Sequence, residues 1–217
     1  MDVREAERQA VRELERQVEN LLQKGYPALA GLPEDELVAR VLPLAGGLPG
    51  LPATGGSTVE PFALVVRRNL VPRHEAAGLV ELDGRRGFTE MEPDDLESFV
   101  DLPELALPSG VVYLVTGVDT GRETLNVTPD DALQQITAAG RSPLTIDEGV
   151  AVVTQHPEVL EENCFSLLGS RCADRRVTAI WLSKRRPRLG WCWAGNPHTW
   201  LGSASCAARI GGVSGQE

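Results

Sequence analysis

The residues that could carry chemistry are concentrated near the C-terminal end of the chain. Between positions 156 and 206 lie all four cysteines, all four tryptophans and two of the three histidines: Cys164, Cys172, Cys192, Cys206, Trp181, Trp191, Trp193, Trp200, His156 and His198. Thiols and imidazoles can bind metals or act as nucleophile and base, and indole rings can contact a ligand. Any site is therefore expected in this segment.

A metal centre is the first interpretation of these residues. Zinc ligands usually come in close pairs such as Cys-x2-Cys, because one turn then fixes two ligands at once. Here seven residues separate Cys164 from Cys172, five separate Cys192 from His198, and seven separate His198 from Cys206. Because no pair has the tight spacing, we predict no metal and no other cofactor. A structural zinc protein stays as an alternative.

A thiol nucleophile is the second interpretation. A reactive thiolate needs a histidine or a helix N-terminus to lower its pKa. The turn-forming run Gly195-Asn196-Pro197 could fold His198 over Cys192, with Asn196 orienting the imidazole. Cys206 follows small residues that could expose backbone amides, so it is an alternative nucleophile. Cys192, Cys206 and His198 are thus candidate catalytic residues of a small enzyme of specialised metabolism, although no hydrolase signature surrounds either cysteine.

The third interpretation is that the cysteines and aromatic residues belong to a packed core. Free cysteine is among the most buried residue types. In a strand, Trp191 and Trp193 would point to one face and Cys192 to the other. We prefer this interpretation for the cysteines.

The loop after these residues is then free to bind a partner. Trp200, His198 and Asn196 lie on a Gly-containing segment, and a basic run precedes them. Such cations could attract an anion, or could pair with the acidic remainder of the chain. We predict a binding or accessory protein for an unknown small molecule or protein, with these ligand-binding residues: Asn196, Trp200, Arg185, Arg186 and Arg188.

Composition limits the function classes. The 217 residues carry a net charge of −10, and residues 164–217 hold 8 of the 21 Lys and Arg but only 2 of the 31 Asp and Glu. A net-acidic chain is not expected to bind nucleic acid. No stretch approaches the ~20 apolar residues of a membrane span. The polar start at 1–5 does not resemble a secretion signal. We expect a bacterial cytoplasmic protein with reduced thiols.

The N-terminal part of the chain is predicted to be helical. Apolar residues spaced by three and four predict an amphipathic helix from Val3 to about Leu21, ended by Gly25. A second helix is expected from Pro33 to about Val41. We therefore predict a helical hairpin over 1–44 and a Gly/Pro-rich linker over 45–61. The apolar stripe needs cover from its own domain or from a second copy, which would make a homodimer.

The remaining residues, 62–217, are predicted to form one domain. Strands are expected at 62–66, 111–115, 177–182 and 189–193, with a hairpin near 79–89 and a turn at 183–188. A short helix opens at Glu92, and hydroxyl caps at Thr128 and Thr145 predict two more helices, the second with a capping box. Mixed order of strands and helices predicts an α+β fold with a mixed sheet.

The chain also resembles an uncharacterised family of proteins of unknown function from actinobacteria. The resemblance runs from about Tyr113 to Arg209 and rests above all on LGWCWAGNPHTWLGSASC (189–206). Shorter stretches also carry it: LNVTPDDAL (125–133), SPLTIDEGVAVVTQHPEVL (142–160), CFSLLGSR (164–171) and, near the start, GYPALAGLP (25–33). It implies a bacterial cytosolic protein, and no residue role is carried over from it.

Overall fold

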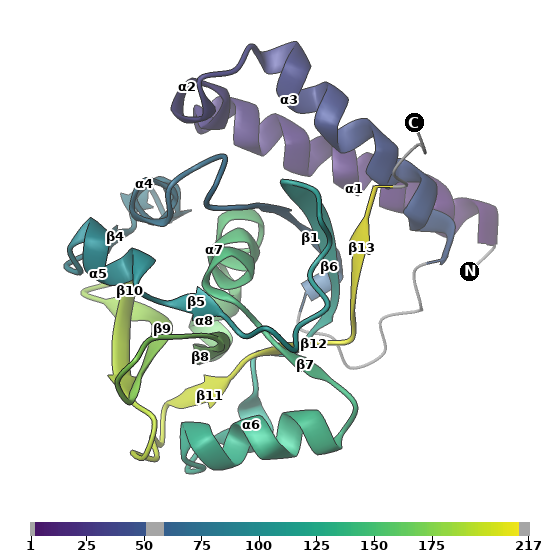
Figure 1. Cartoon of the computed structure of the whole chain (residues 1–217). Helices are drawn as coiled ribbons and strands as arrows, with labels where there is room; N and C mark the ends of the chain where they lie inside the picture. The colour runs from purple at the N-terminus through teal and green to yellow at the C-terminus, as the bar shows by residue number, and fades with distance from the viewer. Residues whose placement is uncertain (1–2, 51–58, 213–217) are drawn as a thin grey trace.

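The computed structural model describes residues 3–50 and 59–212 and has an α+β fold (Figure 1). Its helices are α1 (Val3–Gln23), α2 (Tyr26–Ala30), α3 (Glu34–Val41), η1 (Leu42–Gly50), α4 (Arg73–Leu79), α5 (Pro93–Glu97), η2 (Arg122–Thr124), α6 (Pro129–Ala138), α7 (Ile146–Gln155) and α8 (Val159–Glu162). None of the helices in these ranges combines the length and apolar character needed to cross a bilayer.

The strands are distributed over two larger sheets and two small ribbons. They are β1 (Val59–Val66), β2 (Glu81–Leu82), β3 (Arg85–Arg86), β4 (Phe88–Thr89), β5 (Val100–Asp101), β6 (Val112–Val118), β7 (Ser142–Pro143), β8 (Cys164–Arg171), β9 (Arg176–Ser183), β10 (Arg186–Trp193), β11 (Leu201–Ser203), β12 (Ser205–Cys206) and β13 (Ala208–Gly211). One sheet has the order β1-β6-β13. The other has the order β11-β8-β9-β10-β4, with β5 also paired to β8. In this second sheet β11 and β4 run parallel to their neighbours, so it is mixed, as predicted.

Helix α7 lies at the centre of the molecule, between the two sheets (Figure 1). The Thr145 hydroxyl accepts a bond from the Glu148 amide at 3.3 Å, and the Glu148 carboxylate accepts one from the Thr145 amide at 2.8 Å. The predicted capping box is therefore confirmed. A Cβ at Gly149 would lie 2.2 Å from Leu167 of β8, so this face of α7 must be small to meet the sheet. Every residue of α7 is buried.

The N-terminal helices pack on the same chain. The buried residues Leu14 and Leu21 of α1 join the main core. Gln17, also on α1, donates to the Phe62 carbonyl at 2.8 Å and accepts from the Leu64 amide at 2.6 Å, so its amide caps backbone groups of β1. The apolar stripe of α1 is thus covered within one copy of the chain, and the homodimer through this helix stays a prediction.

The predicted linker begins with regular structure. Helix η1 continues to Gly50, because Leu44 and Leu48 are buried and pack in the same core as α1. Residues 51–58 of the predicted linker lie outside the described residues, and the last three positions belong to β1. The division of the chain at 44 and 61 stays a prediction.

Candidate functional site

The predicted site segment forms the β9–β10 hairpin and the loop after it. Lys184 and Arg185 have φ values of 51° and 62°, which is the left-handed geometry of a two-residue hairpin turn. The turn is therefore shorter than the predicted 183–188, and Arg186 and Arg188 belong to β10. Arg188 lies directly opposite Trp181 of β9 in the antiparallel register. Directly opposed residues share a face of the sheet, so these two side chains meet.

A continuous series of cation and ring contacts crosses this face. The Cζ of Arg186 lies 4.5 Å from the Phe88 ring centre, and the Cζ of Arg188 lies 5.7 Å from Phe88 and 5.2 Å from Trp181. Trp181 and Trp200 meet edge to face at 6.2 Å, and Trp200 and His198 meet at 5.7 Å. We call this set the aromatic–arginine ladder: Phe88, Trp181, Arg186, Arg188, His198 and Trp200.

The members of the ladder differ in exposure: Trp181 is partly buried, whereas Trp200 is exposed to solvent. A Cβ at Gly190 would lie 2.3 Å from the Trp181 ring, so the indole needs a glycine beneath it. Trp200 is 49% exposed. Two buried ladder atoms, Nε of Arg188 and Nε2 of His198, have no hydrogen-bond partner in the described part of the chain. Buried polar atoms usually have a hydrogen-bond partner. Among the described residues these two atoms lack one, and their residues contact Trp181 and Trp200, respectively.

The loop 194–200 that carries the end of the ladder is held at both of its ends. The Ala194 carbonyl accepts from the Asp130 amide at 3.1 Å, and the His198 carbonyl accepts from the Asn126 amide at 2.8 Å. Ala194 is fully buried. Asn196, between these anchors, is exposed. The loop therefore presents its side chains from a fixed base next to the start of α6.

The predicted basic residues gather at the far end of the hairpin. Arg185 pairs with Asp83 at 3.2 Å, and both side chains are exposed. The Arg186 Nε donates to the Arg86 carbonyl at 2.9 Å, and Arg188 forms an ion pair with Glu90. Arg185 and Arg188 thus pair with acidic residues of the chain, which is one of the two interpretations of the basic run. Exposed ion pairs such as that of Arg185 contribute little to stability.

Two further tryptophans on β10 lie apart from the ladder. Trp191 and Trp193 contact each other edge to face at 5.1 Å, and Trp191 also contacts the Arg176 guanidinium at 5.4 Å. They are 39% and 47% exposed. Cys192, between them, packs instead with a small cluster that contains Ala194, as the alternation of a strand predicts.

The candidate catalytic thiols are not placed as nucleophiles. Burial raises the pKa of Cys192, whose Sγ lies 3.9 Å from the Ser166 hydroxyl. Burial, with Glu148 nearby, raises the pKa of Cys206 to about 12. Among the described residues, no hydrogen bond joins either thiol to His198. Both thiols are thus protonated at neutral pH, whereas a nucleophile needs the thiolate.

The other two cysteines have the same character. Burial raises the pKa of Cys164 and of Cys172, and the Cys172 thiol also donates to Asp174 at 3.0 Å. Within residues 3–50 and 59–212, no three His, Cys, Asp or Glu side chains come close enough to hold a metal ion. In this part of the chain the structure offers no ligand set for zinc.

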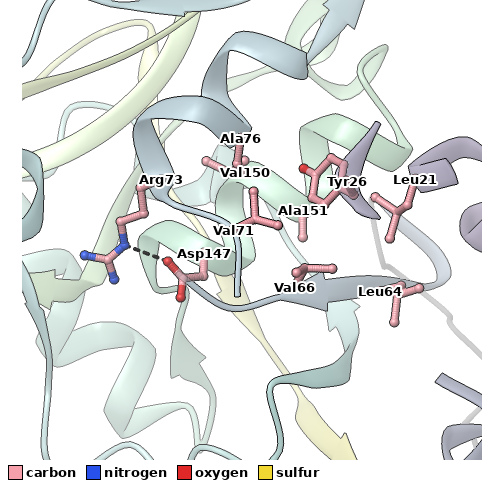
Figure 2. Close-up of a pocket in the computed structure, with 10 residues that line it drawn as sticks. All are labelled: Leu21, Tyr26, Leu64, Val66, Val71, Arg73, Ala76, Asp147, Val150 and Ala151. Atoms are coloured by element: carbon pink, nitrogen blue, oxygen red, sulfur yellow. Dashed lines mark hydrogen bonds and ion pairs between the residues drawn. The ribbon is translucent and has the colours of Figure 1, made fainter. Parts of the chain in front are cut away.

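A pocket in the interior is not a ligand site. Figure 2 shows the space between α1, α4 and α7, where Arg73 and Asp147 form an ion pair at 2.6 Å. Its volume is about 10 Å³, room for roughly one water molecule. Arg73 also donates to the Phe99 carbonyl at 2.6 Å and to Asp101 at 3.0 Å. These buried charges are therefore satisfied internally and serve the fold.

The sequence did not indicate every member of the ladder. Phe88 and Glu90 reach Arg188 only because the two-residue strand β4 pairs in parallel with Arg188 and Leu189 of β10. Parallel pairing between segments about a hundred residues apart leaves no pattern in the local sequence from which the contact could be predicted. The only signal in this region was the Asp83-Gly84 turn, which correctly predicted a hairpin there. Its second strand is β3 (Arg85–Arg86), whereas Phe88 and Thr89 of the return predicted near 87–89 form β4 and pair with β10 instead.

One of the comparisons with known proteins identifies a family, and it names no activity. The model of a family of unknown function, DUF5701, matches residues 20–212. No curated protein and no solved structure matches the chain. The match covers α2 through β13, and hence both sheets and the whole ladder, but only residues 20–23 of α1. The chain belongs to this family of unknown function.

Proposed function

We propose that this chain is a binding protein that holds an acidic segment of another protein against the aromatic–arginine ladder and the loop 194–200. The observation that carries the proposal is the unbroken ladder, in which Trp200 is half exposed. Tryptophan and arginine are the residue types most enriched among side chains that dominate protein interfaces. A large ring held by other rings loses little conformational entropy when a partner covers it.

Charge supports an acidic partner. The exposed hairpin end carries Lys184, Arg185 and Arg186, whereas the whole chain is net acidic. This contrast favours approach of an acidic segment to this end and opposes approach elsewhere. The acidic excess of the chain also argues against a nucleic acid as the partner.

The two alternatives from the sequence receive less support. An enzyme that uses Cys192 or Cys206 with His198 would need a thiolate, and burial favours the protonated thiol at both positions. A zinc protein would need a cluster of ligands that the described residues do not form. We retain the cytoplasmic location and the actinobacterial source suggested by the sequence as parts of the proposal.

A photo-crosslinking amino acid at Asn196 tests the proposal in living cells. Asn196 is exposed beside the ladder, and Glu34 at the start of α3 is an equally exposed control position far along the chain. We expect a discrete protein adduct from position 196 and none of the same mass from position 34. Trp200→Ala should remove the adduct while the chain stays folded, at a cost of no more than about 3 kcal/mol, because only half of the ring is buried, against Trp181 and His198.

The matched control is Val11→Ala, which removes an exposed apolar side chain from α1. This variant should leave the adduct unchanged. Equal adducts from positions 196 and 34, or an adduct that survives Trp200→Ala, would show that the ladder does not select the partner.

A further inference from the structure

A concave surface lies beside α6, and none of its lining residues belongs to the ladder. It is a groove of about 650 Å³ between one side of α6 and the segment that follows β5. Leu102 and Leu105 form one wall, and Leu133 of α6 belongs to the other. This volume falls within the range of small-molecule sites, about 300–1,000 Å³. The groove is therefore large enough for a small ligand with an apolar body.

One cation at this groove is not neutralised by the protein. Arg141 lines the groove and donates from Nε to the Ser205 hydroxyl at 2.8 Å and from Nη2 to the carbonyls of Gly117 and Ser205 at 2.6 and 3.2 Å. All three acceptors are neutral. Within the described residues, Nη1 has no hydrogen-bond partner, and no carboxylate forms an ion pair with this guanidinium.

The neighbouring arginine shows what a compensated cation looks like in this part of the fold. Arg209 is held by both oxygens of Glu148, at 2.5 and 2.9 Å. Arg141 lacks such a partner, although its bonds to Gly117 and Ser205 fix the side chain in place. It follows α6 closely, where the negative end of the helix dipole favours a positive charge. Arg141 thus brings to the lining of the groove a positive charge fixed by the fold, with Nη1 left without a partner among the described residues.

We propose that this groove binds a small monocarboxylic acid with an apolar body. The carboxylate accepts hydrogen bonds from Arg141, because a guanidinium and a carboxylate form short, charge-assisted bonds. The hydrocarbon part lies along the leucine side chains and leaves water. Glu104 also lines the groove and is exposed. A second carboxylate on the ligand would be repelled there, so a dicarboxylate should bind more weakly.

Octanoate, titrated into the full chain and followed by calorimetry, is the probe for this proposal. We expect saturable one-to-one binding with a Kd below about 1 mM. Octan-1-ol, which lacks the charge, and octanedioate, which carries a second one, should each bind at least about tenfold more weakly.

Two variants on α6 make the test independent of the bonds that Arg141 contributes to the fold. Thr137 is exposed and lines the groove, whereas Gln135 is exposed on the same helix and does not line it. Thr137→Trp should fill the groove and weaken octanoate binding by at least about tenfold, and Gln135→Trp should leave it unchanged. Arg141→Gln should abolish the difference between octanoate and octan-1-ol.

Three results would overturn the proposal. They are no saturable octanoate binding to the wild-type chain at millimolar concentration, unchanged binding to Thr137→Trp, and binding of octan-1-ol as tight as that of octanoate. None of these results bears on the ladder, which lies on the β9–β10 hairpin and the loop 194–200.

Discussion

The interior around α7 and the aromatic–arginine ladder use arginine in different ways. In the interior, Arg73 has Asp147 and Asp101 as partners, and Arg209 has both oxygens of Glu148. In the ladder, Arg188 has an ion pair with Glu90, yet its Nε is buried without a partner. The interior arginines use their donors within the fold, whereas Arg188 of the ladder has one donor that the described residues leave without a partner. Unused hydrogen-bonding capacity thus distinguishes Arg188 of the ladder from the two interior arginines.

Breaking an interior pair should have the largest effect on stability. Glu148 is fully buried and accepts bonds from Arg209, from the Tyr113 hydroxyl at 2.9 Å and from the Thr145 amide. Glu148→Gln leaves the Arg209 cation buried without a counter-charge, which we expect to lower the free energy of unfolding by about 3–5 kcal/mol. Urea denaturation measures this loss.

The matched variant is Glu90→Gln, which removes the exposed partner of Arg188. Its effect should stay below about 1 kcal/mol, as for other exposed ion pairs. Similar losses from the two variants would contradict the distinction between the interior and the ladder.

Stability at high pH should depend on the buried thiol of Cys206. Burial raises its pKa to about 12 in the folded chain, from about 8.5 in an unfolded one. Below pH 8.5 both states are protonated, and the stabilisation is fully present. Between about pH 8.5 and 12 only the unfolded state loses the proton, so the contribution of this thiol to stability falls by about 1.4 kcal/mol per pH unit.

Cys206→Ala isolates that contribution. Denaturation midpoints measured from pH 8 to 10.5 should fall less steeply for this variant than for the wild-type chain. Tyr26, whose pKa burial also raises to about 12, contributes a background slope common to both proteins. Equal slopes for the two proteins would mean that the Cys206 thiol does not lose its proton on unfolding in this range.

The sequence predicted those parts of the fold that depend on local signals. Hydroxyl caps correctly indicated the starts of α6 and α7, since the Thr128 and Thr145 side chains bond the third residue of each helix. Strand β8 was not predicted, although it pairs with β5, β9 and β11. Its residues from Phe165 to Ser170 are all buried, so polar and apolar residues do not alternate along it.

The candidate site, too, was predicted only where its residues are close together in the sequence. Trp200, His198 and Asn196 were indicated because they are neighbours in the sequence, and the loop does present Asn196 and Trp200 to solvent. Phe88 could not be indicated, because its contact with Arg188 depends on a parallel strand pair. Residue composition thus indicated part of the candidate site, and only the tertiary structure showed which other residues contact it.

The smallest effect on stability is expected at the exposed end of the hairpin. Arg185 and Asp83 form an ion pair with side chains 71% and 57% exposed. Arg185→Gln should change the free energy of unfolding by no more than about 0.5 kcal/mol, because water already screens this pair. The same variant should lower the yield of crosslinking at position 196, and the yield should then depend less on salt. A cation near the rim of an interface acts mainly on the rate of association. A variant that lowers stability without changing the yield of crosslinking would assign Arg185 to the fold, as for Arg73, and would remove the hairpin end from the proposed interface.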